Sequence, residues 1–273
     1  MFLGKGLPQY EFEVEHVGSH EEDCWKELLA DENMFRRLST KNVDFVNPSR
    51  FFETLLLYKL SIFLREVDVE KAMIPNNVAM TLLCDIHAIN SRDPACRGAS
   101  DVIQYYKTFD AILIYRAAHE IYINGDYDLA RRLNYYCTCQ YGIDIHPAAQ
   151  IGPGCFIDHG TGVVIGETCI IGSNVSIMQG VTLGGNGKET GDRHPIVKDG
   201  VLIGAGAKIL GRITLGNSVK VGAGSVVLND VPDRCTIVGV PGRVVANFNI
   251  YPSLEMDHKV NQYGDRTLEP GKK

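Results

Sequence analysis

Three short polar stretches carry the residue types needed to move a proton and to bind a carboxylate. Asp158-His159 contains a histidine, whose ordinary pKa near neutrality makes it the most common general base. Asp144 precedes His159 by 15 residues, and a carboxylate beside an imidazole can orient it as a base. Arg193-His194 brings a planar guanidinium that fits a carboxylate. On residue types alone, each stretch could equally be solvated surface.

The chain that must position these residues shows a period of six between residues 145 and 227. Twelve slots hold only Ile, Leu or Val: Ile145, Ile151, Ile157, Ile165, Ile171, Ile177, Leu183, Ile203, Ile209, Leu215, Val221 and Val227. Glycine follows directly in seven of these twelve slots. This period matches neither a helix nor a simple strand and is typical of a hexapeptide β-solenoid. The coils of a solenoid must stack, because one repeat cannot cover its own apolar side chain.

Two breaks in the period point to the same candidate residues. Ile157 and Ile165 are 165 − 157 = 8 positions apart, so two residues are inserted beside His159. Leu183 and Ile203 are 203 − 183 = 20 apart, which leaves fourteen extra residues if one side counts as six. We place these extra residues in a polar, Gly-rich excursion over 185–195. Long loops on a regular scaffold usually carry function or are disordered.

Before the repeat, residues 21–141 have helical periodicity. One helix is predicted to start at Asn47-Pro48 and another after Pro75, the second ending near Asp93 because the residue before a proline avoids the α region. Further helices are predicted after Ser100, over 109–124 and over 126–141, the last two each followed by glycine. By this account Asp93 is either a turn residue or part of the site.

These patterns divide the chain into three parts. We expect a helical domain over 1–142, a solenoid over 143–245 and an extended tail over 246–273. The net charge of −6 argues against binding nucleic acid nonspecifically. No apolar run reaches the ~20 residues of a membrane span, no signal peptide is evident, and the eight cysteines lack metal-ligand spacing. We therefore expect a cytoplasmic protein with no metal and no resident cofactor.

The repeat region also carries a set of longer motifs. They are Asp144-Ile145-His146-Pro147-Ala148-Ala149, Asp158-His159-Gly160-Thr161-Gly162, Gly166-Glu167-Thr168, Val181-Thr182-Leu183-Gly184-Gly185, Gly191-Asp192-Arg193-His194-Pro195, Gly204-Ala205-Gly206-Ala207-Lys208-Ile209-Leu210-Gly211 and Gly239-Val240-Pro241-Gly242. Arg92-Asp93-Pro94-Ala95 lies upstream of them. Together they resemble the serine O-acetyltransferases, a hexapeptide-repeat acyltransferase family, over roughly residues 43–262.

The resemblance implies a fold and a reaction. The fold is α+β: an N-terminal all-α helical domain followed by a left-handed parallel β-helix. The reaction transfers an acetyl group from acetyl-CoA to the hydroxyl of L-serine for cysteine biosynthesis, with feedback inhibition by L-cysteine. His159 is then the general base and Asp144 its partner. The resemblance also implies substrate-binding residues. Asp93 and Asp158 would bind the amino group of serine, and Arg193 and His194 would bind its carboxylate.

The resemblance also implies partners. Acetyl-CoA, a co-substrate rather than a bound cofactor, would lie along the coils near Gly185, Gly204, Ala205, Lys220 and Ala223. The family's site lies between neighbouring subunits of a homotrimer, which the helical domain can pair into a dimer of trimers. Members that dock into O-acetylserine sulfhydrylase use a C-terminal isoleucine, whereas this chain ends in Lys273, so that docking is not expected.

Three alternative functions share the solenoid scaffold. An acetyltransferase for another acceptor, such as a sugar, would not need residues for both charges of an amino acid. A zinc-dependent carbonic anhydrase would need three histidines with one pair five apart, whereas His146, His159 and His194 are separated by 13 and 35 residues. A catalytically inactive scaffold is opposed by the presence of the candidate catalytic residues.

Overall fold

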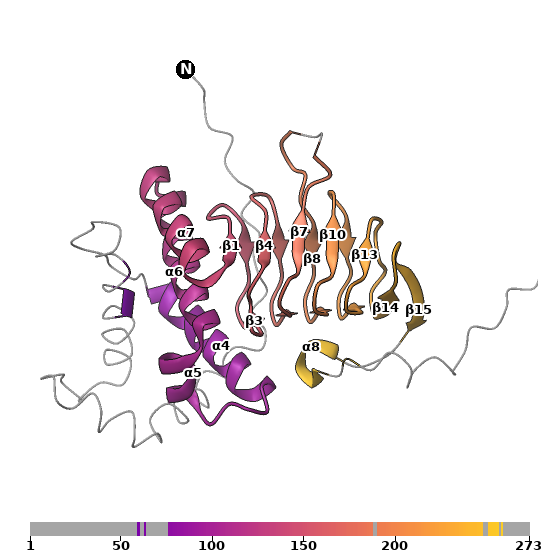
Figure 1. The fold of residues 1–273 in the computed structure, drawn as a ribbon, viewed down its shortest axis with the longest axis horizontal. Helices are drawn as coiled ribbons and strands as arrows, with labels where there is room; N and C mark the ends of the chain where they lie inside the picture. Colours follow the sequence, from indigo (N-terminus) through magenta and orange to yellow (C-terminus); the bar gives the residue numbers. More distant parts are fainter. Residues whose placement is uncertain are drawn as a thin grey trace, which may run out of the picture.

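The computed structural model describes residues 59–60, 63, 76–187, 190–247, 251–256 and 258. Figure 1 shows most of the helices gathered at one end of an elongated prism of stacked strands. The predicted start of a helix at Asn47-Pro48 and the C-terminal residues used to judge docking lie outside the described residues. No helix among the described segments combines the length and apolar character needed to cross a membrane.

The helical part matches the predicted boundaries closely. The helices are α4 (Asn76–Arg92), α5 (Ala99–Tyr105), α6 (Lys107–Ile123) and α7 (Tyr127–Tyr141). The α4 helix ends directly before Asp93-Pro94, as the proline predicts. Asp126 caps α7 by accepting a 3.1 Å hydrogen bond from the Leu129 amide, and Gly142 ends it with a φ of 67°.

The strands form three parallel sheets, the sides of the prism, here called sheets A, B and C. Sheet A contains β1 (Ile143–Ile145), β4 (Val163–Ile165), β7 (Thr182–Gly184), β10 (Lys208–Leu210) and β13 (Val226–Val227). Sheet B contains β2 (Gln150–Ile151), β5 (Ile170–Ile171), β8 (Ile196–Val197) and β11 (Thr214–Leu215). Sheet C contains β3 (Phe156–Ile157), β6 (Ser176–Ile177), β9 (Leu202–Ile203), β12 (Lys220–Val221), β14 (Cys235–Val238) and the antiparallel β15 (Arg243–Asn247).

Successive coils align the predicted aliphatic slots. Ile145 pairs with Ile165, which pairs with Leu183; Leu183 pairs with Ile209, which pairs with Val227. These steps of 20, 18, 26 and 18 residues describe an 18-residue coil with two and then eight residues inserted. Eleven of the twelve slots are buried, the exception being the half-buried Ile151. Stacking thus builds the solenoid core.

The second insertion is shorter than predicted. Val197 in β8 is 1 % exposed and forms a buried side of the coil between Leu183 and Ile203. Eight residues are therefore extra, not fourteen. The structure does contain the predicted excursion, which projects from the prism after β7 in Figure 1. The prediction from the six-residue period missed Val197 because this residue follows the excursion and is itself followed by Lys198, not by glycine.

A buried ion pair joins the helices to the first coil. Asp85 of α4 accepts hydrogen bonds of 2.6 and 2.9 Å from the guanidinium of Arg116 in α6. The same guanidinium donates to the carbonyls of Ile151 and Gly152, and Asp85 also accepts from the Cys155 amide at 2.8 Å. Because four of the five guanidinium N–H donors and both carboxylate oxygens are hydrogen-bonded, the pair fixes the helices against the solenoid.

A second buried arginine holds the end of α4. The Arg92 guanidinium donates to the Gly154 carbonyl at 3.1 Å, to Ser176 Oγ at 3.2 Å and to Asn174 Oδ1 at 2.7 Å. These partners belong to two successive coils. The next residue in the chain is Asp93, so this anchor places Asp93 against the solenoid.

The segment after residue 245 differs from the extended tail that we predicted. The β15 strand continues to Asn247, and a short helix, α8 (Pro252–Glu255), follows. Pro252 and Ser253 are buried, and the Ser253 carbonyl accepts a 2.9 Å hydrogen bond from Ser176 in sheet C. This buried hydrogen bond holds the segment against the solenoid.

Candidate active site

The predicted general base lies on the prism edge where sheet C passes to sheet A, here called the C–A edge. His159 follows β3 and precedes β4, and its side chain is 75 % exposed. Its φ of 55° is in the left-handed region, which few residues other than glycine adopt. Its Nε2 lies 3.8 Å from Oδ1 of Asp158. The two-residue insertion thus presents an accessible imidazole beside a carboxylate.

Asp93 lies close enough to Asp158 at this edge for its charge to act on that carboxyl. Asp93 accepts hydrogen bonds from the Ala95 amide at 2.8 Å and from the Tyr106 hydroxyl at 2.7 Å. Burial raises the pKa of Asp158, and the nearby negative charge of Asp93 raises it further, while His159 acts in the opposite direction. Two carboxylates that share one site favour a bound cation, such as an ammonium group, between them.

Arg193 and His194 lie on the edge where sheet A passes to sheet B, here called the A–B edge. They stand at the base of the excursion, just before β8. Arg193 Nη2 donates a 2.8 Å hydrogen bond to Glu167, which lowers the pKa of that carboxyl. The Arg193 side chain remains 31 % exposed and can still meet a ligand.

Thr168 organises this second group. Its hydroxyl oxygen accepts hydrogen bonds of 3.1 Å from the backbone amides of Arg193 and His194, and its own amide donates to His194 Nδ1 at 3.1 Å. Arg212, from the next coil, donates to the carbonyls of Thr168 and His194. Burial and the charge of Arg193 lower the pKa of His194. The excursion is therefore fixed at its base by two neighbouring coils.

Asp144 has a hydrogen-bond partner other than His159 within one chain. It lies in β1, where Oδ1 accepts a 3.1 Å hydrogen bond from Asn134 of α7. Among the described residues no hydrogen bond joins Asp144 to His159. Although 15 residues make most of one turn, Asp144 sits within sheet A and His159 on the C–A edge. Their pairing as base and orienting group stays a prediction.

The two groups of site residues occupy different edges of the same prism. His159, Asp158 and Asp93 lie at the C–A edge, whereas Arg193 and His194 lie at the A–B edge. The width of sheet A separates these edges, and a three-residue strand spans roughly 10 Å. A single chain thus presents two half-sites of complementary chemistry.

Three of the residues predicted to contact acetyl-CoA line the C–A edge beyond His159. Gly204 and Ala205 precede β10, and Ala223 precedes β13 one coil later. A Cβ on Gly204 would lie 2.6 Å from the Ala223 nitrogen, so glycine is required for the two coils to stack there. Gly185 instead packs against the Arg193 side chain at the A–B edge.

Lys220 does not fit the predicted contact with acetyl-CoA. It lies in β12 of sheet C, and only 3 % of its surface is exposed. A phosphate needs an accessible ammonium group, and this one is covered within its own chain. We therefore leave Lys220 out of the acetyl-CoA site.

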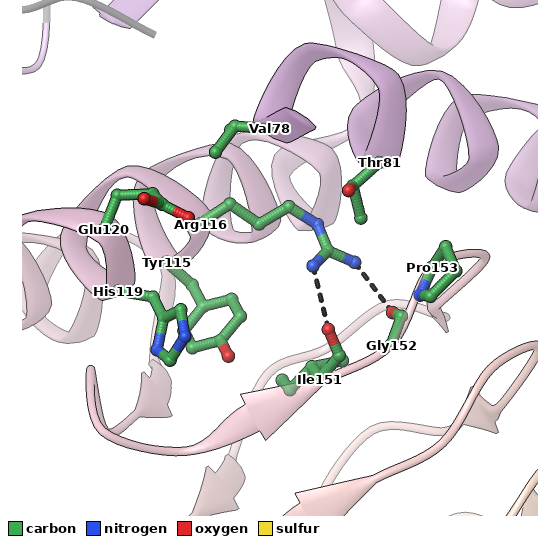
Figure 2. A pocket seen from close by; sticks show the side chains of 9 residues that line it. All are labelled: Val78, Thr81, Tyr115, Arg116, His119, Glu120, Ile151, Gly152 and Pro153. Atoms are coloured by element: carbon green, nitrogen blue, oxygen red, sulfur yellow. Dashed lines mark hydrogen bonds between the residues drawn. The ribbon is translucent and has the colours of Figure 1, made fainter. Parts of the chain in front are cut away.

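One cavity of about 260 Å³ lies away from both groups, at the junction between helices and solenoid (Figure 2). Its lining residues come from α4, α6 and the first coil: Val78, Thr81, Tyr115, Arg116, His119, Glu120, Ile151, Gly152 and Pro153. Figure 2 shows Arg116 reaching across it to the Ile151 and Gly152 carbonyls. None of the predicted site residues lines this cavity.

Two family models match the chain. The N-terminal serine acetyltransferase model matches residues 51–113, and the six-repeat bacterial transferase hexapeptide model matches residues 194–229. A serine acetyltransferase of Salmonella typhimurium is 45 % identical over 212 residues, covering 75 % of this chain and 78 % of that protein. The chain belongs to the serine acetyltransferase family. The helical and repeat regions of that family are thus both present.

Other serine acetyltransferases agree with this assignment. The protein of Bacillus subtilis is 52 % identical over 175 residues, covering 64 % of this chain and 81 % of the relative. A solved serine acetyltransferase in complex with cysteine matches with a TM-score of 0.74 at 36 % identity, over 88 % of this chain and 99 % of that one. The soybean enzyme complexed with serine matches with a TM-score of 0.66 at 40 % identity, over 84 % and 97 %.

Two residues of this family member were not assigned roles from the sequence. Thr168 stood in the Gly166-Glu167-Thr168 motif without a function, and Tyr106 carried no signal at all. The motif could have marked Thr168 as important but not what it contacts. Tyr106 becomes relevant only when α5 and α6 bring its hydroxyl to Asp93.

Proposed function

We propose that this chain transfers the acetyl group of acetyl-CoA to the hydroxyl of L-serine. The reaction gives O-acetylserine and CoA and supplies cysteine biosynthesis. The observation that carries the proposal is the approach of Asp93 and Asp158 beside the exposed His159. An acceptor with an ammonium group next to its hydroxyl fits that arrangement, whereas an uncharged sugar does not explain it.

The C–A edge supplies the catalytic half of the proposed site. The ammonium group of serine would lie between Asp93 and Asp158, which places its hydroxyl toward His159. The imidazole takes the hydroxyl proton as the oxygen attacks the thioester carbonyl, and general-base catalysis of this kind contributes about 10²–10⁴-fold. The left-handed backbone at His159 presents the ring outward, where a substrate can reach it.

The A–B edge supplies the carboxylate-binding half. Arg193 offers two parallel donors and a permanent positive charge, and His194 adds a donor beside it. Glu167 holds one side of the Arg193 guanidinium, which restricts its orientation. The pair of edges therefore matches the two charges of an amino acid, an ammonium group at one and a carboxylate at the other.

We further propose that the complete site forms between two copies of the chain. Within one copy the two halves are separated by sheet A, so one copy alone cannot enclose an amino acid with both. In a homotrimer of parallel prisms, the C–A edge of one copy can face the A–B edge of the next. Most closed oligomers repeat one such contact by rotational symmetry. Two such trimers can pair through the helices, as the family resemblance implies.

Acetyl-CoA would lie along the C–A edge next to His159. Gly204, Ala205 and Ala223 provide a narrow track of small residues on that edge, which allows a ligand to approach the backbone. The thioester carbonyl then reaches the serine hydroxyl at the end of the track. Asp144 completes the proposal as the group that orients His159 in the assembled site.

L-Cysteine fits the same half-sites as L-serine, because it carries the same ammonium and carboxylate groups. We therefore propose that it competes with serine and inhibits the enzyme. A thiol replaces the hydroxyl, so the site distinguishes the two only at the reacting atom. A solved relative is described as a complex with cysteine, and another as a complex with serine.

A direct assay tests the reaction. The chain is incubated with acetyl-CoA and a panel of acceptors, and release of free thiol from CoA is followed. L-Serine should give saturable turnover that L-cysteine inhibits competitively, whereas ethanolamine and 3-hydroxypropionate, which each lack one charge, should be poor acceptors. Turnover with a sugar but not with serine would assign the chain to the alternative acceptor class.

A further inference from the structure

The donors around His194 determine which of its ring nitrogens carries a proton. The backbone amide of Thr168 can only donate a hydrogen bond, and it points at His194 Nδ1 over 3.1 Å. The Thr168 hydroxyl is also 3.0 Å from Nδ1. That hydroxyl already accepts from the amides of Arg193 and His194, so its own proton is directed to Nδ1. Nδ1 therefore acts as an acceptor.

We propose that His194 acts in this site as a neutral imidazole with its proton on Nε2, and that Thr168 is the residue that sets this tautomer. The inference rests on the proposed serine site and specifies how that site binds the carboxylate of serine. Arg193 then supplies the only positive charge of the pair, while His194 supplies a directed, uncharged Nε2–H donor.

The surroundings of the ring support a fixed, neutral group. His194 is 7 % exposed, and its ring lies directly over Gly166, where a Cβ would come within 2.2 Å of Nε2. Among the charged and titratable groups that the structure describes around it, Arg193, Arg212 and His146 disfavour a second proton and only Glu167 favours one. A buried imidazole beside two guanidinium groups is more stable without its own charge.

Three substitutions of His194 separate a neutral donor from a cation. The amide nitrogen of glutamine can replace the Nε2–H donor without a charge, whereas asparagine is too short and alanine has no donor. We expect H194Q to raise the serine KM less than about threefold, and H194A and H194N to raise it about tenfold or more, as loss of a hydrogen bond to a charged group predicts. An equal rise of the serine KM in H194Q and H194A would overturn the inference.

The pH dependence gives a second readout that a purely structural role would not change. If His194 is neutral throughout, the ratio of serine KM values of H194Q and wild type stays constant from pH 6 to 8. If His194 works as an imidazolium ion, this ratio falls as pH rises, because the wild type then loses its charge. Taking the ratio cancels the titration of serine and of every group that the two enzymes share.

Thr168 is tested by its own matched pair. T168V removes the hydroxyl and keeps the shape, so serine KM should rise at least threefold with little change in acetyl-CoA KM, whereas T168S should restore it. A wild-type serine KM in T168V would remove Thr168 from this role. Absence of serine-dependent turnover in the wild type would instead contradict the proposed function itself, so the two failures are distinguishable.

Discussion

The hydroxyl of Tyr106 donates a 2.7 Å hydrogen bond to Oδ2 of Asp93, across the gap between the start of α6 and the end of α4. The other oxygen, Oδ1, accepts from the Ala95 amide, so both oxygens of this carboxylate are fixed. Burial and this hydrogen bond to Asp93 raise the pKa of Tyr106, which therefore remains a donor at neutral pH. Tyr106 thus positions a carboxylate that faces the proposed ammonium site.

Removing this hydroxyl should weaken serine binding. Tyr106→Phe keeps the ring and loses one hydrogen bond to a charged group, which typically contributes about 1.5–3 kcal/mol. We expect the serine KM to rise about tenfold, with acetyl-CoA KM and melting temperature nearly unchanged. Tyr105→Phe, on the exposed side of α5, is the control and should behave as wild type. A serine KM that stays the same in Tyr106→Phe would exclude a positioning role.

Removing the proposed base should act on turnover rather than binding. His159→Ala should lower kcat by at least about 10²-fold while the acetyl-CoA affinity changes little, since the base acts on the serine hydroxyl. Steady-state kinetics and direct binding of acetyl-CoA check the two parts separately. Near-normal turnover in this variant would remove His159 from the role.

Arg193 should act mainly through the carboxylate of serine. Arg193→Ala should raise the serine KM strongly with a smaller effect on acetyl-CoA. Arg193→Lys keeps the charge but loses the planar fork, so we expect it to recover only part of the loss. Esterified serine, which lacks the carboxylate charge, should respond little to either change. Equal losses for serine and its ester would show that Arg193 does not read the carboxylate.

The ion pair between Asp85 and Arg116 should matter for stability. Arg116→Met leaves the fully buried Asp85 carboxylate without its partner, and breaking a buried pair in this way typically costs about 3–5 kcal/mol. The matched control is Arg132→Met, which breaks an exposed pair with Asp128 four residues away and should cost about 0.5 kcal/mol or less. Chemical denaturation measures both. A similar decrease of the free energy of unfolding in the two variants would contradict a special role of the buried pair.

Stability should also decline in mild acid. Burial lowers the pKa of His146 and of His194 below that of the unfolded chain, so the unfolded state binds more protons as pH falls. Their contribution to the free energy of unfolding is therefore present above about pH 6.5 and is lost as pH falls below it. The free energy of unfolding then changes by at most about 1.4 kcal/mol per pH unit for each histidine. Denaturation at pH 7.5, 6.5 and 5.5 should show H194Q losing less stability than the wild type.

Much of the fold could be predicted because it repeats. The aliphatic period predicted the solenoid, the proline after Asp93 predicted the end of α4, and Gly142 predicted the boundary between helices and coils. The proline and glycine signals depend only on residues that are neighbours in the chain. The aliphatic period can be recognised because the same short unit is repeated and stacked. The period failed at Val197, where an eight-residue insertion displaced the phase and no glycine followed the buried residue.

The site could be predicted only as a set of residues. Their types indicated a base, two carboxylates and an anion-binding pair, and the family motifs assigned these groups to serine. The contacts of Thr168 with His194 and of Tyr106 with Asp93 join residues 26 and 13 positions apart in the chain, and no periodic pattern indicates them.

The sequence by itself thus determined a stacked solenoid with helices before it and the chemical groups available for an amino-acid acceptor. Only the tertiary structure decided that these groups fall on two different edges of the prism, because the 18-residue coil and its insertions set the edge on which each residue emerges. It also decided that Lys220 is covered and that His194 is held over Gly166, since burial depends on which coils and segments pack together.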